Sequence, residues 1–350
     1  MDFGHLNPFV APGSPRVILI QLKALIICSA GPEAGLGHMA RALRVAGGLT
    51  RRLDAVVTIC ILGPRTKHAI SESVDVQFFE HTNSLCKTGL LERIQPSVML
   101  LDLAPQNTPS DLIEFLAAGK AANIKLVAID GLLTHREQLD LVFIPSFRHP
   151  AATHVRATSE AKVIHGWDCY LLDETPNPLS WHAGPKVLVL TGGSDTTQLG
   201  RTWPTLLNDR LPDGTEVNWV TGPFAQAPVW PQPQRIRMTQ HLAPNGLQPL
   251  MSTTNYAVTV YGVSFFELLQ LGVPTVVFSP YGGKDDPELQ EIEQEGLAIV
   301  AKDEMDATEK LIALMNNEEL ATRLSAAAAE KLSSRGIDRL CSEVKMLVST

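Results

Sequence analysis

The chain has 350 residues, of which 45% are hydrophobic and 19% are charged, and its formal net charge is −8. This length is typical of two domains of ordinary size, and this composition is typical of a globular protein rather than a disordered one. The acidic balance argues against a nucleic-acid-binding protein and against binding to an anionic membrane, because both need basic surfaces.

The N-terminus and the cysteines carry no targeting or metal signature. Residues 1–15 hold three prolines and lack the basic start and apolar core of a signal peptide, so we expect a flexible extension. No run of about 18 uninterrupted apolar residues occurs, which predicts no transmembrane helix. No cysteine pair has Cys-x-x-Cys spacing, so we expect no zinc site, a reducing cytoplasmic location, and buried thiols at Cys28 and Cys60.

Apolar, strand-like runs alternate with helix-like segments through the first half of the chain. The predicted strands are Val17–Ser29, Ala55–Leu62, Val74–Phe79, Val98–Leu103, Lys125–Ile129 and Leu141–Ile144. The predicted helices are Arg41–Leu53, Leu85–Ile94 and Leu112–Ala121, and the pair Gly47-Gly48 is interpreted as a helix terminus. This alternation is typical of a doubly wound parallel sheet that is covered on both faces.

The second half repeats the same alternation after a proline-rich stretch. Its predicted strands are Lys186–Leu190, Glu216–Val220, Arg235–Arg237, Tyr256–Val260 and Thr275–Phe278. Its predicted helices are Leu247–Met251, Ser264–Leu271, Pro287–Glu295, Asp306–Met315, Glu318–Leu332 and Ile337–Leu347. In such sheets ligands bind beyond the carboxyl ends of the strands, so the cleft between two such domains is the expected site.

The first candidate motif is Gly35-Leu36-Gly37-His38, with Arg41 three residues later, between the first predicted strand and helix. Glycines let the backbone approach a ligand closely, and the N-terminus of a helix favours negative charge. A histidine there can take or give a proton near neutral pH. The alternative is a tight turn with a capping or packing histidine.

A second glycine turn, Thr191-Gly192-Gly193-Ser194, follows the strand Lys186–Leu190. Its glycines permit unusual φ angles, and the hydroxyls of Thr191 and Ser194 can donate hydrogen bonds, which suits a diphosphate. The alternative is a tight turn in which Ser194 or Asp195 caps the next helix.

The third motif is Gly262-Val263-Ser264, followed by Glu267 in an otherwise apolar helix. A carboxylate is costly there unless it is paired or hydrogen-bonded, and the adjacent hydroxyls of a ribose can satisfy it. The N–H groups near Ser264 can meet a phosphate. The alternative is an exposed glutamate on the polar side of the helix.

Taken in this order, the three motifs resemble those of the two-domain GT-B nucleotide-sugar enzymes. The resemblance runs from about residue 24 to residue 332. It is greatest to the branch that contains the UDP-sugar hydrolase of pseudaminic acid biosynthesis and the spore-coat polysaccharide glycosyltransferase-like proteins. More distantly, the chain is similar to the UDP-N-acetylglucosamine transferase of peptidoglycan synthesis.

The resemblance implies an α/β fold of the GT-B class, with two Rossmann-like doubly wound domains that face a cleft. We expect an N-terminal domain at 16–172, a linker at 173–185, a nucleotide-sugar-binding domain at 186–332, and a C-terminal helix at 333–350 that packs back on the first domain. The implied substrate is a UDP-sugar, with a sugar, a glycoconjugate or water as the second reactant. No cofactor and no metal are implied, and the sequence has no Asp-x-Asp pair.

The resemblance also implies roles for single residues. His38 matches the catalytic base, and Glu267 matches the carboxylate that holds the ribose. The residues expected to bind the nucleotide sugar are Gly35, Gly37, Thr191, Gly192, Gly193, Ser194, His241, Gly262, Val263, Ser264, Glu267 and Gln290. Asp102, Asp130 and Asp195 are candidates either for contacts with sugar hydroxyls or for caps and turns.

Two departures leave the nucleophile open. Where the hydrolase branch carries Arg-x-Asp, this chain has residues 28–33 without that motif, and where the branch carries Asn-Gln, this chain has Leu289-Gln290. Three hypotheses follow: an inverting glycosyltransferase of surface polysaccharide or glycoconjugate synthesis, a UDP-sugar hydrolase, and a nucleotide-sugar-binding protein without turnover.

Overall fold

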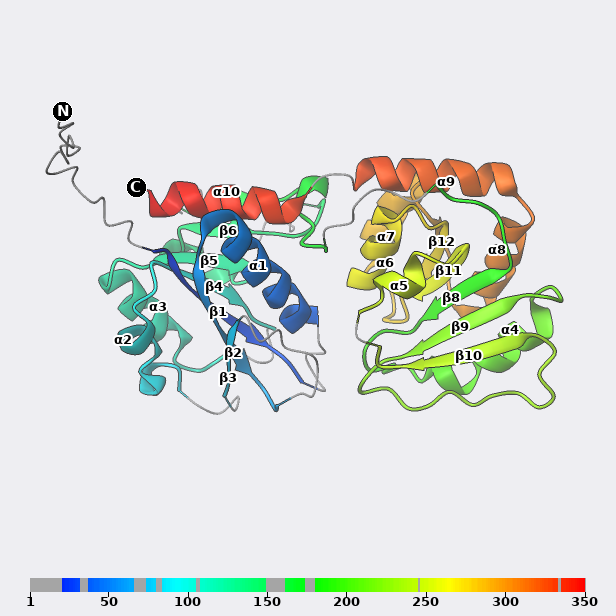
Figure 1. Ribbon diagram of the computed structural model, residues 1–350, viewed down its shortest axis with the longest axis horizontal. Coiled ribbons are helices and arrows are strands. Elements are labelled where there is room, and N and C mark those ends of the chain that lie inside the picture. The colour runs from blue at the N-terminus through cyan, green and yellow to red at the C-terminus, as the bar shows by residue number, and fades with distance from the viewer. Residues whose placement is uncertain are drawn as a thin grey trace, which may run out of the picture.

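The computed structural model describes residues 21–31, 37–65, 74–79, 84–104, 108–148, 161–173, 180–244, 246–332 and 335–349. In these ranges the chain forms two α/β units, each built on its own sheet (Figure 1). The expected extension at 1–15, Gly35 and residues 174–179 of the expected linker lie outside the described residues. Within the ranges above, no helix has both the length and the hydropathy that crossing a membrane would require.

The first sheet has seven parallel strands in the order β3-β2-β1-β4-β5-β6-β7. They are β1 (Lys23–Ser29), β2 (Val56–Leu62), β3 (Asp75–Phe79), β4 (Val98–Asp102), β5 (Lys125–Ile129), β6 (Leu141–Phe143) and β7 (Lys162–Ile164). The helices around this sheet are α1 (Gly37–Leu53), α2 (Leu90–Ile94), α3 (Leu112–Ala121) and α10 (Gly336–Val348).

Both faces of the first sheet are covered. Ala24 and Ile26 of β1 belong to a core that contains residues of α1 and α10, whereas Leu25 and Ile27 belong to a core with α2 and α3. Successive side chains of a strand point to opposite faces, so a strand buried on both sides is apolar at every position. This explains why β1 and β4 read as continuous apolar runs.

The second sheet has six parallel strands in the order β10-β9-β8-β11-β12-β13. They are β8 (Lys186–Leu190), β9 (Glu216–Thr221), β10 (Arg237–Leu242), β11 (Tyr256–Val260), β12 (Thr275–Phe278) and β13 (Ile299–Val300). Its helices are α4 (Trp203–Arg210), α5 (Gln248–Met251), α6 (Val263–Gln270), α7 (Asp286–Gln294), α8 (Glu304–Met315) and α9 (Glu318–Lys331). The predicted fold class, two doubly wound α/β units, is confirmed.

The strand order reverses at one place in each sheet. In the first sheet the chain leaves β1 for β2 on one side and later returns to pair β4 with the other side of β1. In the second sheet β8 has the same place between β9 and β11. Ligands of such sheets bind in the crevice at this switch point, beyond the carboxyl ends of the strands.

Several elements differ from the sequence-based expectation. The expected helix Leu85–Ile94 is a 3₁₀ turn followed by α2, because Gly89 between them has φ +62°. The expected strand Arg235–Arg237 begins at Arg237 and continues to Leu242 as β10, an edge strand whose polar residues hide the usual pattern. The short strands β7 and β13 and helix α4 were not predicted.

Helix α1 does not end at Gly47-Gly48, so that interpretation is wrong. The helix continues to Leu53, and α10 packs against it (Figure 1). A Cβ at Gly48 would overlap Cγ2 of Ile337 on α10. The glycine therefore serves close helix–helix packing. One turn further on, Arg52 pairs with Asp338 of α10.

This close contact predicts opposite effects for two neighbouring substitutions. Gly48→Ala should lower the free energy of unfolding by about 1–3 kcal/mol, because the new methyl group forces α10 away from α1. Gly47→Ala should raise it by up to about 1 kcal/mol, because its Cβ meets only the guanidinium of Arg51 and alanine favours helix. Urea unfolding of both variants checks this, and equal effects would contradict the packing role of Gly48.

Aromatic side chains join the two units. Tyr170, after β7, stacks on Phe266 of α6 with ring centroids 4.1 Å apart, and Trp167 stacks on Phe147 at 4.2 Å. Tyr170 and Phe266 are buried in one core that also contains residues of α7 and α9. This contact packs α6 against the first unit, where Glu267 of α6 pairs with Arg44 of α1.

Candidate functional site

Helix α1 carries a polar cluster at the switch point of the first sheet. Nδ1 of His38, in the first turn of α1, lies 2.6 Å from Oδ1 of Asp102, the last residue of β4. Arg41 donates from Nε to Oδ2 of Asp102 at 2.7 Å and from Nη2 to Oδ1 at 2.6 Å. Its Nη1 donates to Oδ2 of Asp130, directly after β5, at 2.8 Å. The cluster thus joins α1 to the ends of two adjacent strands.

The charges in this cluster stabilise one another. Asp102 is fully buried, and the Arg41 side chain is 9% exposed. Burial by itself would raise the pKa of Asp102, but the charge and hydrogen bonds of Arg41, with the hydrogen bond of His38, hold it below its usual value. Burial disfavours the Arg41 cation as well, yet Asp102 and Asp130 raise its pKa above the usual value. Asp102 therefore remains a carboxylate.

The carboxylate determines what His38 can do. Because Nδ1 faces Asp102, the neutral imidazole carries its proton on Nδ1 and donates it to that carboxylate. Nη2 of Arg41, 3.3 Å from Nδ1, is then a second donor near the same carboxylate rather than a partner of the ring. Nε2 is left as the basic atom, and Asp102 stabilises the imidazolium that forms when Nε2 takes a proton. The side chain is 22% exposed, so a reactant can reach it.

The glycine turn after β8 occupies the switch point of the second sheet. Gly192 has φ +85°, in the left-handed region, and both Gly192 and Gly193 are exposed. Gly222, directly after β9, lies so close to the turn that a Cβ there would overlap the backbone of Gly192 and Gly193. The N–H of Phe224 donates to the carbonyl oxygen of Gly193 at 3.0 Å. The turn is thus held from the β9 side while its glycines stay accessible.

Gly222→Ala should therefore weaken the binding of a nucleoside diphosphate more than it weakens the fold. The methyl group would displace the turn by pushing on the backbone of Gly192 and Gly193. We expect the dissociation constant to rise by about tenfold, which corresponds to about 1.4 kcal/mol. Titration calorimetry measures this, with the melting temperature as the control, and an unchanged dissociation constant would contradict the role of the turn.

Glu267 lies in the second turn of α6, on the side that faces the first unit. Its side chain is 13% exposed, so the alternative of an exposed surface glutamate is wrong. The carboxylate accepts a hydrogen bond from Nη2 of Arg44 on α1. Burial raises the pKa of Glu267 above its usual value, and the Arg44 cation and the Ser264 hydroxyl oppose that shift. A buried carboxylate is thus available to a ligand with hydroxyl groups.

One cavity of about 930 Å³ connects α1 with the glycine turn and with α6. This volume suits a ligand of nucleotide-sugar size. The expected site residues that line it are Gly37, Thr191, Gly192, Gly193, Ser194, Gly262, Val263, Ser264 and Glu267. His38 lies beside the cavity, between Gly37 and Met39, which both line it.

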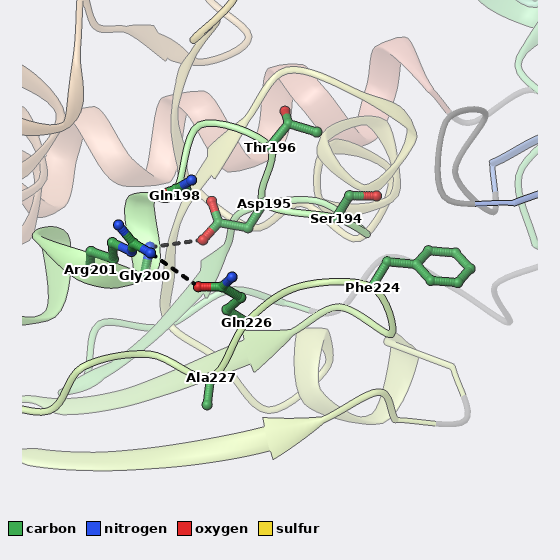
Figure 2. A pocket seen from close by; sticks show the side chains of 9 residues that line it. All are labelled: Ser194, Asp195, Thr196, Gln198, Gly200, Arg201, Phe224, Gln226 and Ala227. Carbon is green, nitrogen blue, oxygen red and sulfur yellow. Dashed lines mark hydrogen bonds between the residues drawn. The ribbon is translucent and has the colours of Figure 1, made fainter.

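A smaller cavity of about 180 Å³ adjoins the same turn (Figure 2). It shares Ser194, Asp195 and Thr196 with the large cavity. Asp195 accepts hydrogen bonds from the N–H groups of Leu199 at 2.9 Å and Gly200 at 2.8 Å, and its own φ is +44°. Asp195 therefore has the turn-stabilising role, and both of its carboxylate oxygens are engaged.

Comparison with protein-family models and with curated proteins finds no match, whereas many solved structures match. UGT2 of Phytolacca americana, solved with UDP-2-fluoro-glucose and pterostilbene, is 11% identical with a TM-score of 0.63 over 93% of this chain and 100% of that chain. MurG of Acinetobacter baumannii is 13% identical with a TM-score of 0.59 over 93% and 99%. A putative UDP-N-acetylglucosamine 2-epimerase from Listeria monocytogenes is 13% identical with a TM-score of 0.63 over 93% and 96%.

The chain has the GT-B fold. At this level of identity the match establishes the fold, and the chemistry of this GT-B chain has to be argued from its own residues. The narrower resemblance to the pseudaminic acid and spore-coat branch stays a prediction.

Besides His38, three expected site residues are not among the described residues that line the cavity of the GT-B chain. His241 lies on the edge strand β10 with Nε2 2.9 Å from Oδ1 of Asn218, and Gln290 is exposed on α7; neither lines the cavity. Gly35 lies outside the described residues. Their roles in binding stay predictions.

Two residues of the site were not expected from the sequence. Arg44 follows His38 and Arg41 at a spacing of three residues, so a search for polar residues along one face of α1 could have found it. Gly222 carries no signal in its own neighbourhood, because its importance arises only from the turn that packs against it.

Proposed function

We propose that this chain is a glycosyltransferase that uses a nucleotide sugar and inverts the configuration at the anomeric carbon. The observation that carries the proposal is the pairing of two half-sites around one cavity. His38 is held by a buried carboxylate at one switch point, and the glycine turn and Glu267 lie at the other. A base opposite an anion-binding turn is the arrangement that displacement at a sugar–diphosphate bond needs.

In the proposed reaction, Nε2 of His38 takes the proton from a hydroxyl group of the acceptor. The acceptor oxygen forms a bond to the anomeric carbon while the bond between that carbon and the diphosphate oxygen breaks. The electron pair leaves with the nucleoside diphosphate, and attack from the opposite side inverts the anomeric centre. Asp102 stabilises the imidazolium that results.

The departing diphosphate would be stabilised by backbone groups rather than by a metal ion. The exposed turn at Gly192 and Gly193 offers N–H groups, and the first N–H groups of α6, at Val263 and Ser264, have no partner within the helix. Glu267 would accept hydrogen bonds from the ribose hydroxyls. The Phytolacca neighbour was solved with a UDP-sugar analogue, which supports a UDP-sugar as the donor.

We further propose that the enzyme acts in surface polysaccharide or glycoconjugate synthesis in the cytoplasm and needs no added cofactor.

The test is UDP release by the full chain from a panel of UDP-sugars, with and without sugar and glycoconjugate acceptors. Release that depends on an acceptor is the expected result. Rapid release without an acceptor would replace the transferase with the hydrolase, and UDP binding without release would favour a binding protein.

A further inference from the structure

The side chain of Arg44, in the first unit, contacts Glu267 of the second unit, the carboxylate that is proposed to bind the ribose. It lies on α1, two turns after His38, and its Nη2 donates to Oε1 of Glu267 on α6. Its Nε lies 3.1 Å from Oδ2 of Asp173, in the segment that leaves the first unit. All three residues line the large cavity. The two units thus meet at the carboxylate that the proposed function assigns to the ribose.

The third nitrogen of this guanidinium is unused. Nη1 of Arg44 is buried and has no hydrogen-bond partner among the described residues. A buried donor without a partner is costly, so the pairing of the other two nitrogens is what keeps this side chain at the cavity. Because the other two nitrogens are held by Glu267 and Asp173, the direction of Nη1 is fixed before a ligand arrives.

The positive charge of Arg44 also stabilises the ionised form of Glu267. The carboxylate is largely buried in a helix that is otherwise apolar, and the cation of Arg44 is the charge that offsets its burial. A protonated Glu267 would accept fewer hydrogen bonds from a ribose, since an ionised carboxylate accepts at both oxygens. Removing Arg44 should therefore impair hydrogen bonding between the carboxylate of Glu267 and a ribose.

We propose that Arg44 is a positioning residue of the ribose site: it holds the carboxylate of Glu267 at the cavity, where the ribose hydroxyls can donate to it. The inference rests on the proposed function, because it needs Glu267 to bind a ribose. It adds that ribose recognition is complete only when both units are together, since α1 supplies one half of the site and α6 supplies the other.

The test compares nucleotides with and without the ribose hydroxyls. UDP, ADP and GDP are titrated calorimetrically into the full chain, and the tightest binder is then compared with its 2′,3′-dideoxy analogue. The wild-type chain should prefer the ribonucleotide by about tenfold to hundredfold, because the analogue leaves Glu267 without its partners. Arg44→Gln should lose most of that preference, with a change of less than about threefold for the analogue.

Two further variants distinguish a positioning role of Arg44 from a general disturbance of the fold. Arg44→Lys keeps the charge but loses the planar fork, so it should recover part of the preference. Arg52→Gln removes an α1 arginine whose partner Asp338 lies on α10 rather than at the cavity, and it should leave the preference unchanged. Melting temperatures of all three variants establish that each is folded.

The outcomes distinguish the two proposals. A wild-type preference for the ribonucleotide that Arg44→Gln retains would overturn the role of Arg44 alone. Tighter ribonucleotide binding by Arg44→Gln would also overturn it, because Arg44 would then compete with the ribose for Glu267. A wild-type chain that binds no nucleoside diphosphate, or binds both forms equally, would overturn the ribose site and, with it, that part of the proposed function.

Discussion

Turnover of the nucleotide sugar should fall by about 10²–10⁴-fold in the His38→Ala variant, the range that a general base contributes. The reason is the geometry at Nδ1: Asp102 accepts from that nitrogen at 2.6 Å, which leaves Nε2 as the basic atom of a side chain whose neighbours Gly37 and Met39 line the cavity. Binding of UDP should change little, because His38 is not among the residues that are expected to contact the nucleotide. UDP release and UDP titration measure the two effects separately.

A matched control is available on the same unit. His135 lies on a 3₁₀ turn and contacts Thr134, so His135→Ala should keep the wild-type rate. If His38→Ala also kept the wild-type rate, His38 would not be the base. If instead it lost turnover together with UDP binding and thermal stability, the loss would report a damaged fold rather than a missing base.

The second large effect is expected for Asp102→Asn, on both stability and turnover. The substitution leaves the buried Arg41 cation without its main partner, and breaking a buried ion pair costs about 3–5 kcal/mol of unfolding free energy. It also removes the carboxylate that orients His38. Asp130→Asn is the matched control: Asp130 meets the same arginine but is 43% exposed, so the loss should be about 1 kcal/mol or less. Urea unfolding compares them, and equal losses would contradict the burial argument.

The ion pair of Asp102 and Arg41 also makes the stability of the fold depend on pH, and the pKa of Asp102 gives the direction. The pKa of Asp102 is lower in the folded chain than in the unfolded chain, where a carboxyl of this type titrates near about 3.9. Its stabilising contribution is therefore fully present above that value and is lost as the pH falls through the lower folded pKa. As the pH falls below about 5, the free energy of unfolding should decrease more for the wild type than for Asp102→Asn. Parallel plots of unfolding free energy against pH would contradict this.

The elements that the sequence predicted well are those with a strong local pattern. The strands Lys125–Ile129, Lys186–Leu190 and Tyr256–Val260 are reproduced residue for residue. Each is largely apolar and, apart from a lysine at the start of the first two, fully buried. β10 was misplaced because an edge strand needs no apolar alternation, and β13 has only two residues. Local periodicity fails where burial is partial or the element is short.

Some features of the candidate site could likewise be predicted from the sequence, and others could not. The glycine turns and His38 were visible in the sequence because each follows a predicted strand at the place where ligands bind. That Asp102 is the partner of His38, 64 positions away, was not visible, since it depends on β4 lying beside β1. The pairing of Arg44 with Glu267, 223 positions away, depends on how the two units pack.

By itself the sequence determined the class of most elements, the alternation that makes two parallel sheets, and the turns where anions can bind. These follow from short-range rules: side-chain periodicity, glycine φ angles and helix polarity. Only the tertiary structure decided which charges neutralise each other and which glycines carry close packing, as at Gly48 and Gly222. The physical reason is that burial and Coulomb energy depend on distances across the fold, and strand order and the packing of the two units determine those distances.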